Sequence, residues 1–428
     1  MGIKYIYIRL MADWKANLWL AIELLIVSVI LWVIVDWLYV RVSRVSEDTG
    51  FDISNTFLVD ISTVSPRAPE YRGEEDNDSA TYHDRMEIVN RLRHRPEVEC
   101  VGISFNAYPY DPNNNTTNVN YISGTGDTIR NAISWIPIRI VTPDFLRVFR
   151  YRGAHGETPD ELAAMLEKEP DGVILSSGIF GDKIDTDTFI GKEVEVYYNR
   201  LNDYAPRKVI GICKPVKYTE YHSQKNSASV VSLFGPDNMY LLHQAEFTVR
   251  VKDGMAKDFI ENLMADSPTQ FRIGNQFISD VQSFESIARN STQASRKDTR
   301  NRLVVMVFLL VNIFLGLLGT FWFRTRQRVS EIALMKVVGA TSRSVFITQI
   351  GEGLILLLLV TPLAALIDIN IAAMELNARG DVGFLEWPRL WACVGIVFVI
   401  MAVMIVCGVA IPARKGMLVD PAAALHDE

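Results

Sequence analysis

The chain has 428 residues, 22% of them charged, and a formal net charge of −7 at pH 7. Taken over the whole chain, these values are those of an average soluble protein. They average over segments that face two different solvents, however, so the net charge predicts no class of partner. The distribution of apolar residues along the chain is more informative.

The first element is an apolar segment at 18–40 that follows several basic residues. A cleaved signal peptide would end in a site of small residues, and the DWLYVR that ends this segment offers no such site. We therefore predict an uncleaved membrane anchor, although Glu23 and Asp36 lie within it. Residues 1–17 are predicted to lie along the inner membrane surface as an amphipathic helix.

Residues 41–300 are predicted to form a folded domain, because about 260 residues can bury one or two hydrophobic cores. An alternating segment at 51–62, a helical pattern at 81–95 and a strand pattern at 98–105 predict a β-α-β unit. A further strand at 135–141 and a short helix follow. The domain is therefore expected to mix helices and strands.

Two sub-domains are expected within this α/β domain. Between 153 and 244, short strand patterns are separated by Gly, Asp and Asn, whereas 245–282 returns to the strand, helix, strand pattern. We assign 41–152 together with 245–282 to one sub-domain, and 153–244 to a second, β-rich one. Residues 283–302 are polar with helical periodicity, and are predicted to form a stalk helix that continues into the next apolar segment.

Three apolar segments complete the membrane part. Segments 303–323 and 390–411 contain no charged residue, and 350–374 carries Glu352 and Asp368 towards its two ends. At about 1.5 Å rise per residue, each is long enough to cross a hydrocarbon core of roughly 30 Å. The predicted fold class is an α+β membrane protein with four transmembrane helices, one before and three after a large extracytoplasmic α/β domain of two sub-domains.

The charges of the connecting loops predict the orientation. Loop 324–349 contains several arginines and a lysine against a single acid, whereas loop 375–389 is acidic on balance. By the positive-inside rule, loop 324–349, both chain ends and the tail 412–428 are cytoplasmic, and 41–300 lies outside.

Catalytic and metal-binding patterns are absent from the sequence. The six histidines form no H-E-x-x-H motif and no close pair, no serine stands in G-x-S-x-G, and Gly191-Lys192-Glu193 lacks the rest of a phosphate loop. We expect no enzyme, no bound cofactor and no metal, with ATP and Mg²⁺ bound by another subunit. Cys100 and Cys213 could form a disulfide or remain as two buried thiols.

Acidic residues within apolar segments can mark a pathway for ions across the membrane. Glu352 lies between Gly351 and Gly353, where small residues permit close helix contact, so we assign all three to helix packing. Asp36 and Asp368 are expected at the outer interface. No chain of acids lies at mid-membrane, which argues against an ion-coupled carrier.

The loop sequence RQRVSEIALMKVVGATSRSV resembles the FtsX-like permease domain of ABC systems, with its pattern R-x-x-E-I-x-x-x-K/R-x-x-G-A. The tail, which contains DPAAAL, resembles the end of that domain. The external segments VTPDFLRVF, VILSSGIFGDKI, FIGKEVEVYY and KVIGICKPVKY resemble, in order, the periplasmic core domain of MacB-type permeases. That resemblance makes the first sub-domain porter-like.

The resemblance implies the permease subunit of an ATP-driven system in which two permease subunits pair, as a homodimer or a heterodimer. MacB proper carries its own ATPase, so here a separate ABC ATPase subunit is expected. A coupling helix in the loop would contact it, and the alternative is a plain basic loop that only fixes the topology. The residues that the resemblance assigns to ATPase coupling are Arg328, Glu331, Ile332, Leu334, Met335, Lys336, Val338, Gly339 and Ala340.

Two functions are compatible with these expectations. The first is export or release of a drug, peptide, lipid or lipoprotein, with a periplasmic adaptor or outer-membrane partner. The second is a mechanical relay that transports nothing and controls an extracytoplasmic cell-wall hydrolase or sensor kinase. In both, the chain lies in the bilayer of the bacterial inner membrane and contacts no nucleic acid.

Overall fold

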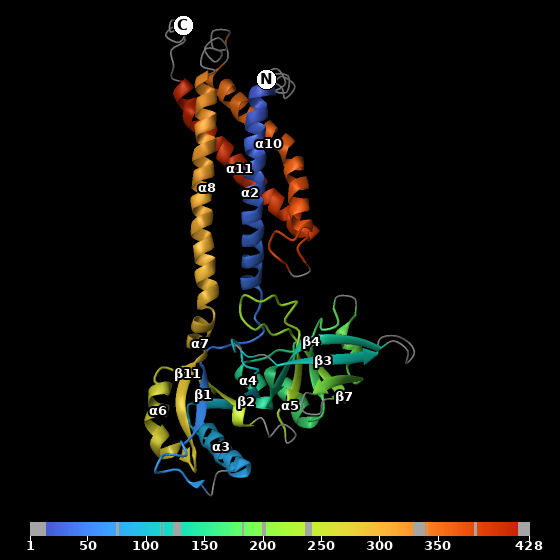
Figure 1. Ribbon diagram of the computed structural model, residues 1–428, viewed down its shortest axis with the longest axis vertical. Coiled ribbons are helices and arrows are strands. Elements are labelled where there is room, and N and C mark those ends of the chain that lie inside the picture. The colour runs from blue at the N-terminus through green and yellow to red at the C-terminus, as the bar shows by residue number, and fades with distance from the viewer. Residues whose placement is uncertain are drawn as a thin grey trace. The chain divides into compact units, whose positions relative to one another are not determined.

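The structure is a computed structural model, shown in Figure 1. Contacts between residues divide the chain into two units, which are described separately: Met1–Ser43 with Lys297–Glu428, and Arg44–Arg296. The described residues are 14–73, 77–111, 113, 115–122, 130–181, 184–198, 203–235, 242–327, 339, 341–380 and 383–417.

Four long helices, labelled in Figure 1, are each long and apolar enough to cross a membrane. One is N-terminal and three are C-terminal, so the predicted fold class is confirmed. Because backbone groups in a bilayer must bond internally, unbroken helices are the expected form of such segments. The helices are α2 (Trp14–Ser46), α8 (Gln293–Gln327), α10 (Ser342–Ala373) and α11 (Trp387–Met417).

Helices α2, α10 and α11 share an apolar core that includes Leu24, Trp32, Leu357 and Met401. Helix α8 contributes the buried Leu317, while many of its other apolar side chains are exposed in the single chain. An interfacial helix was predicted at residues 1–17. Residues 1–13 lie outside the described part of the chain, and residues 14–17 belong to α2.

The α/β unit contains two β-α-β segments that interleave. The four strands lie in the order β11, β1, β9, β2, and every neighbouring pair is antiparallel. Strand β9 therefore lies between the two strands of the predicted β-α-β unit, which gives a ferredoxin-like split β-α-β topology. The elements are β1 (Thr56–Thr63), α3 (Asp78–Arg93), β2 (Val98–Phe105), β9 (Glu246–Val251), α6 (Phe259–Gln270) and β11 (Gln276–Ser283), with the short β10 (Arg272–Ile273) at the edge.

A closed six-stranded barrel is inserted between β2 and β9. Its strands follow the order β4, β3, β6, β7, β5, β8, and a parallel pairing of β8 with β4 closes it. Closure removes the free strand edges that an open sheet would expose. The barrel strands are β3 (Thr116–Ile122), β4 (Arg130–Val141), β5 (Val173–Ser176), β6 (Glu193–Tyr198), β7 (Asp203–Cys213) and β8 (Val230–Leu233).

The barrel begins earlier than the sub-domain boundary that was placed at residue 153. Strand β3 has the polar sequence TTNVNYI, which carries little of the apolar alternation that marks a strand. Strand β4 takes part in both sub-domains, because its end pairs with β2 at Ser104 and Val141 while the rest pairs with β3 and β8.

Two short helices cover the surface of the α/β unit next to β2 and β7. Helix α4 (Pro143–Val148) crosses β2 at Gly102, where a Cβ atom would lie 2.6 Å from the Cα of Phe145, so only glycine permits this approach. Helix α5 (Pro159–Lys168) begins with a capping box formed by Thr158 and Glu161. A 3-10 turn, η2 (Thr186–Phe189), precedes β6.

The predicted stalk consists of two helices rather than one. Helix α7 (Phe284–Ser291) ends at Thr292, and α8 begins at the next residue. The hydroxyl of Thr292 is buried and donates to the Ala288 carbonyl, 2.6 Å away. Helix α7 is anchored by Phe284, which packs in the core of the α/β unit.

Candidate functional site

The predicted ATPase-coupling residues lie almost entirely outside the described part of the chain. Gly339 is the exception: it is exposed and has φ +97°, a conformation that glycine adopts without strain. Thr341 follows as the N-cap of α10 and accepts a hydrogen bond from the Ser344 amide. The coupling residues outside the described part are Arg328, Glu331, Ile332, Leu334, Met335, Lys336, Val338 and Ala340.

The two helix ends that border this loop are described. Helix α8 ends at Gln327, and near its end the Arg326 guanidinium lies 4.6 Å from the centre of the Trp322 ring. An aromatic ring followed by basic residues is typical of the interface between a membrane and water. The loop is therefore joined to α8 and α10, two of the four long helices.

Residues Gly351, Glu352 and Gly353, assigned to helix packing, lie in the first part of α10. Glu352 and Gly353 are buried and Gly351 is half-buried. This burial is what a packing role requires.

Asp36 of α2 and Arg389 of α11 form an ion pair inside the helical unit. The Asp36 side chain is fully buried, and Arg389 Nε lies 3.0 Å from its Oδ1 atom. Asn377 Nδ2 donates to Asp36 Oδ2 over 3.1 Å. Arg389 also donates to the carbonyls of Ala378 and Phe384, so the pair ties α2 to the connection between α10 and α11.

Little in the sequence pointed to this ion pair. Asp36 was expected to reach the outer interface, and Arg389 was considered only as a loop charge. The structure places both side chains between helices, because each neutralises the other and the polar backbone of the connection satisfies the guanidinium. An arginine directly before an apolar segment was the available signal.

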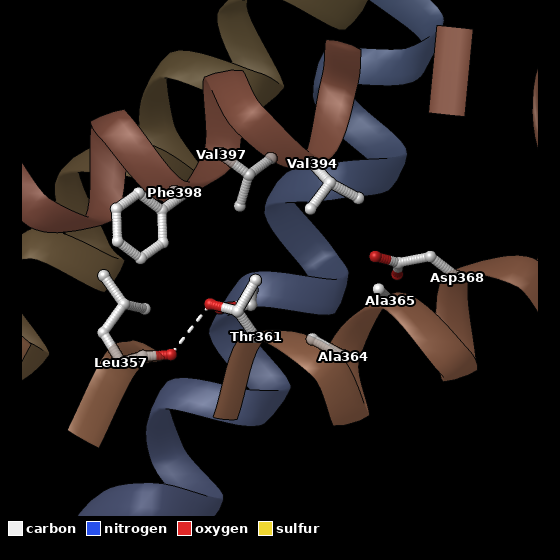
Figure 2. Close-up of a pocket in the computed structure, with 9 residues that line it drawn as sticks. Leu357, Thr361, Ala364, Ala365, Asp368, Val394, Val397 and Phe398 are labelled. Carbon is white, nitrogen blue, oxygen red and sulfur yellow. Dashed lines mark hydrogen bonds between the residues drawn. The ribbon is translucent and has the colours of Figure 1, made fainter. Parts of the chain in front are cut away.

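Asp368 of α10 faces a small cavity in the helical unit, drawn in Figure 2. Its side chain is 2% exposed, and among the described residues its Oδ1 atom has no hydrogen-bond partner. The cavity has a volume of about 10 Å³, which is room for about one water molecule. It is lined by Ser28, Leu357, Thr361, Ala364, Ala365, Val394, Val397 and Phe398 as well as Asp368.

Helices α2 and α8 are joined by polar contacts towards both ends. Thr320 of α8 donates to Glu23 Oε2 of α2 over 3.1 Å, and Arg41 of α2 donates to the Thr299 hydroxyl over 2.7 Å. Glu23, which had made the limits of the first span uncertain, thus has a partner on α8. These contacts fix the axial register of the two helices.

Two buried cations hold the segment that follows α2 within the α/β unit. Lys217 is fully buried, and its Nζ atom donates to the Arg44 carbonyl over 2.7 Å and lies 2.9 Å from the Glu47 carboxylate. Arg250, also fully buried, donates to the carbonyls of Asp52 and Ser54 over 2.8 and 2.9 Å. Residues 44–54 are therefore attached at one end to the connection between β7 and β8, and at the other end to β9.

Residues 303–421 match the model of a known family, described as FtsX-like permease C-terminal. The chain carries an FtsX-like permease domain. The match covers α8, α10, α11 and the loop with the predicted coupling residues, so this part of the resemblance is confirmed. No curated protein matches the chain. The likeness of the α/β unit to a MacB-type core domain stays a prediction.

An FtsX-like permease domain implies a membrane permease subunit of an ABC-type system. Permeases with this domain generally work with ABC ATPase partners and usually lack ATPase activity of their own. Among the residues that the structure describes, no group of three or more His, Cys, Asp and Glu side chains could hold a metal ion.

Proposed function

We propose that the chain relays movement from a separate ATPase to its α/β unit, which lies outside the membrane. The ATPase would bind the loop between α8 and α10 on the cytoplasmic side of a bacterial inner membrane. ATP and Mg²⁺ would be bound by that partner. The α/β unit would then handle the cargo or the partner on which the system acts.

The observation that carries this proposal is the continuity of α2 and α8. Helix α2 runs without a break for 33 residues and α8 for 35 residues. The boundaries between the two units of the chain fall inside these helices, at Ser43 and Lys297. An α-helix transmits an axial displacement because its backbone hydrogen bonds run along its axis. The loop next to α8 and the sheet that holds the end of α2 can therefore be coupled.

The attachments at the outer ends of these helices support the same mechanism. Lys217 and Arg250 fix the chain after α2, and Phe284 anchors α7 before α8. A flexible linker at either place would absorb the displacement. Buried attachments pass it on to β9 through Arg250, to the connection after β7 through Lys217, and to the end of β11 through Phe284.

The cavity beside Asp368 favours a relay over passage of cargo between the helices of one chain. Its volume of about 10 Å³ admits a water molecule, and a drug, peptide or lipid is many times larger. We propose that such a cargo is handled by the α/β unit and released to an adaptor or outer-membrane partner. The same observation supports a second candidate, in which the movement controls an extracytoplasmic hydrolase or kinase and nothing is transported.

A second permease subunit is part of this proposal. Along α8, apolar side chains such as Val304, Phe308 and Leu315 are exposed in the single chain. In a bilayer they contact either lipid or a partner helix, and close helix contact is favoured by small residues. Gly316 and Gly319 of α8 have open space where a Cβ atom would be, so a partner helix can approach there.

The coupling step can be tested by co-purification with the partner ATPase. We expect Glu331→Lys and Gly339→Pro to lose the complex, because the first reverses a charge at the contact and the second requires a conformation that proline cannot adopt. Glu375→Lys is the matched control, since Glu375 is an exposed acid in the opposite connection. An unchanged complex with unchanged ATP turnover in both loop variants would exclude this role.

A further inference from the structure

The chain passes twice between the split β-α-β sub-domain and the barrel. These two connections, here called crossings, meet at one residue. The first crossing leaves β2 after Phe105 and enters β3 at Thr116, and the second returns to β9 at Glu246. Glu246 is the register partner of Ser104, so the end of the second crossing lies beside the start of the first.

The Glu246 carboxyl group binds the first crossing directly. Its Oε1 atom accepts a hydrogen bond from the Asn106 amide over 2.9 Å. Its Oε2 atom accepts from the Ser104 hydroxyl over 2.6 Å and from the Ala107 amide over 3.3 Å. One side chain thus bonds to the end of β2 and to the first two residues of the crossing.

Asp111, further along the same crossing, brings a second carboxyl group to this point. Its side chain is 2% exposed, and Oδ1 accepts from the Asn113 amide over 2.8 Å. Its Oδ2 atom is buried, and no donor from the described residues reaches it. The Asp111 and Glu246 carboxyl groups lie within hydrogen-bonding distance of each other. Ionised carboxylates only accept hydrogen bonds, so this contact requires a proton on one of them.

The neighbouring charges do not neutralise the pair. Arg139 of β4 is close, but its guanidinium donates to the carbonyls of Ala107 and Val216, over 2.7 and 3.0 Å. Tyr108 and Tyr218 face the two acids, and burial raises the pKa of both phenols, so they are neutral. Asp60 adds a further negative charge near Tyr108.

We propose that Glu246 and Asp111 together bind one proton, and that this proton holds the crossing between the sub-domain and the barrel closed. Loss of the proton places two like charges in contact in a partly dry site, and the cheapest relief is movement of residues 106–111 away from β9. The barrel would then be held to the sub-domain through fewer contacts, so the local pH would set how freely it moves.

The direction of the pH effect follows from the same contacts. Burial, followed by the charge of Asp111, raises the pKa of Glu246 from 4.5 to about 8, and burial raises the pKa of Asp111 as well. A raised carboxyl pKa means that the closed state keeps a proton that the open state loses. The closed state is therefore fully favoured below about pH 4.5 and loses this advantage as the pH rises through about 8.

Hydrogen–deuterium exchange of the full chain in lipid nanodiscs tests the proposal. After correction for the intrinsic effect of pH, protection of the Asn106 and Ala107 amides should fall about tenfold between pH 6 and pH 7 in the unmodified chain and level off above about pH 8, because only the closed state keeps the proton between about pH 4.5 and 8. Glu246→Gln should remove this pH dependence, because its amide donates to Asp111 without a titrating proton.

Two further variants complete the experiment. Asp111→Asn should also remove the pH dependence, and it remains informative if Glu246→Gln does not fold. Glu99→Gln, an exposed acid on β2, should behave as the unmodified chain. An unchanged pH dependence in both pair variants would overturn the proposal. So would a loss of protection at pH 6 on adding EGTA that Ca²⁺ restores, because the pair would then bind a cation.

Discussion

The Arg389 Nε atom lies 3.0 Å from Asp36 Oδ1, with both side chains buried between membrane helices. Transferring two charges out of water costs several kcal/mol each, and only good geometry and further hydrogen bonds offset that cost. Here Asn377 donates a hydrogen bond to the carboxylate, and two backbone carbonyls accept hydrogen bonds from the guanidinium. The pair fixes α2 against the connection between α10 and α11.

Breaking this pair from one side should destabilise the helical unit strongly. Asp36→Asn leaves the buried Arg389 charge with only the more distant Glu386 carboxylate, 3.8 Å away, and we expect a loss of about 3–5 kcal/mol in the free energy of unfolding. Thermal unfolding in detergent, followed by tryptophan fluorescence, measures the loss. The double variant Asp36→Leu with Arg389→Met removes both charges and should recover most of it. A double variant as unstable as the single one would show that the hydrogen bonds to the connection matter more than the charge pair.

Asp368 has no hydrogen-bond partner for its Oδ1 atom among the described residues, so removing its carboxyl group should stabilise the chain. Asp368→Leu places apolar atoms in an apolar cavity, and we expect a gain of about 1–3 kcal/mol. The apparent melting temperature in the same detergent is the readout. Asp368→Glu is the matched control: it keeps the carboxyl group, adds a methylene and should not stabilise. If Asp368→Leu lowers the melting temperature, the carboxyl group has a hydrogen-bond partner in the membrane, for example in a second subunit.

Lys217→Met should weaken the attachment of the segment after α2. It removes a buried donor and leaves Glu47 without its counter-ion, which we expect to cost about 3–5 kcal/mol. Lys208→Met is the control, because Lys208 pairs with Glu169 at the surface and such pairs contribute about 0–1 kcal/mol.

A second readout of the Lys217 variant addresses the proposed relay. If displacement passes through this attachment, a chain that still folds should hydrolyse ATP with its partner but lose the cellular activity of the system. Equal loss of activity in the Lys208 variant would show that general instability is the cause.

The predicted orientation can be measured by cysteine labelling in intact cells and in permeabilised cells. In a Cys407→Ala background, Asn113→Cys should react with an impermeant maleimide from outside, because residue 113 is exposed in the α/β unit. Thr341→Cys should react only after permeabilisation, since it lies beside the basic loop. The reverse pattern would place the α/β unit in the cytoplasm.

The long apolar helices and several individual strands were predictable because the residue patterns that indicate them are local in the sequence. Val98–Phe105 and Glu246–Val251 are strands with the bounds that their alternating and β-branched residues indicate. The short β8 is different: four residues (VVSL) carry little pattern, yet their parallel pairing with β4 closes the barrel. Such closure depends on partners distant in sequence, so no local pattern predicts it.

The same limit applies to the buried charges. Asp36, Arg389 and Lys217 were visible as individual residues, but nothing near them in sequence identifies their partners. Whether a charge in an apolar segment faces water or a counter-ion is decided by the rotation of one helix against another. The family motif, by contrast, was recognisable because its residues are consecutive.

The insertion of the barrel at one point of the sub-domain has a consequence for how such proteins can change. Ser104 and Glu246 are neighbours in register, so everything between them leaves and re-enters the sheet at a single place. A tight turn could join Ser104 to Glu246 directly, but the stretch that it replaced includes Lys217 and Val148, whose hydrogen bonds hold the chain after α2 and the side chain of Arg250. An exchange of the barrel for another module, by evolution or by an engineer, would therefore have to keep these two attachments.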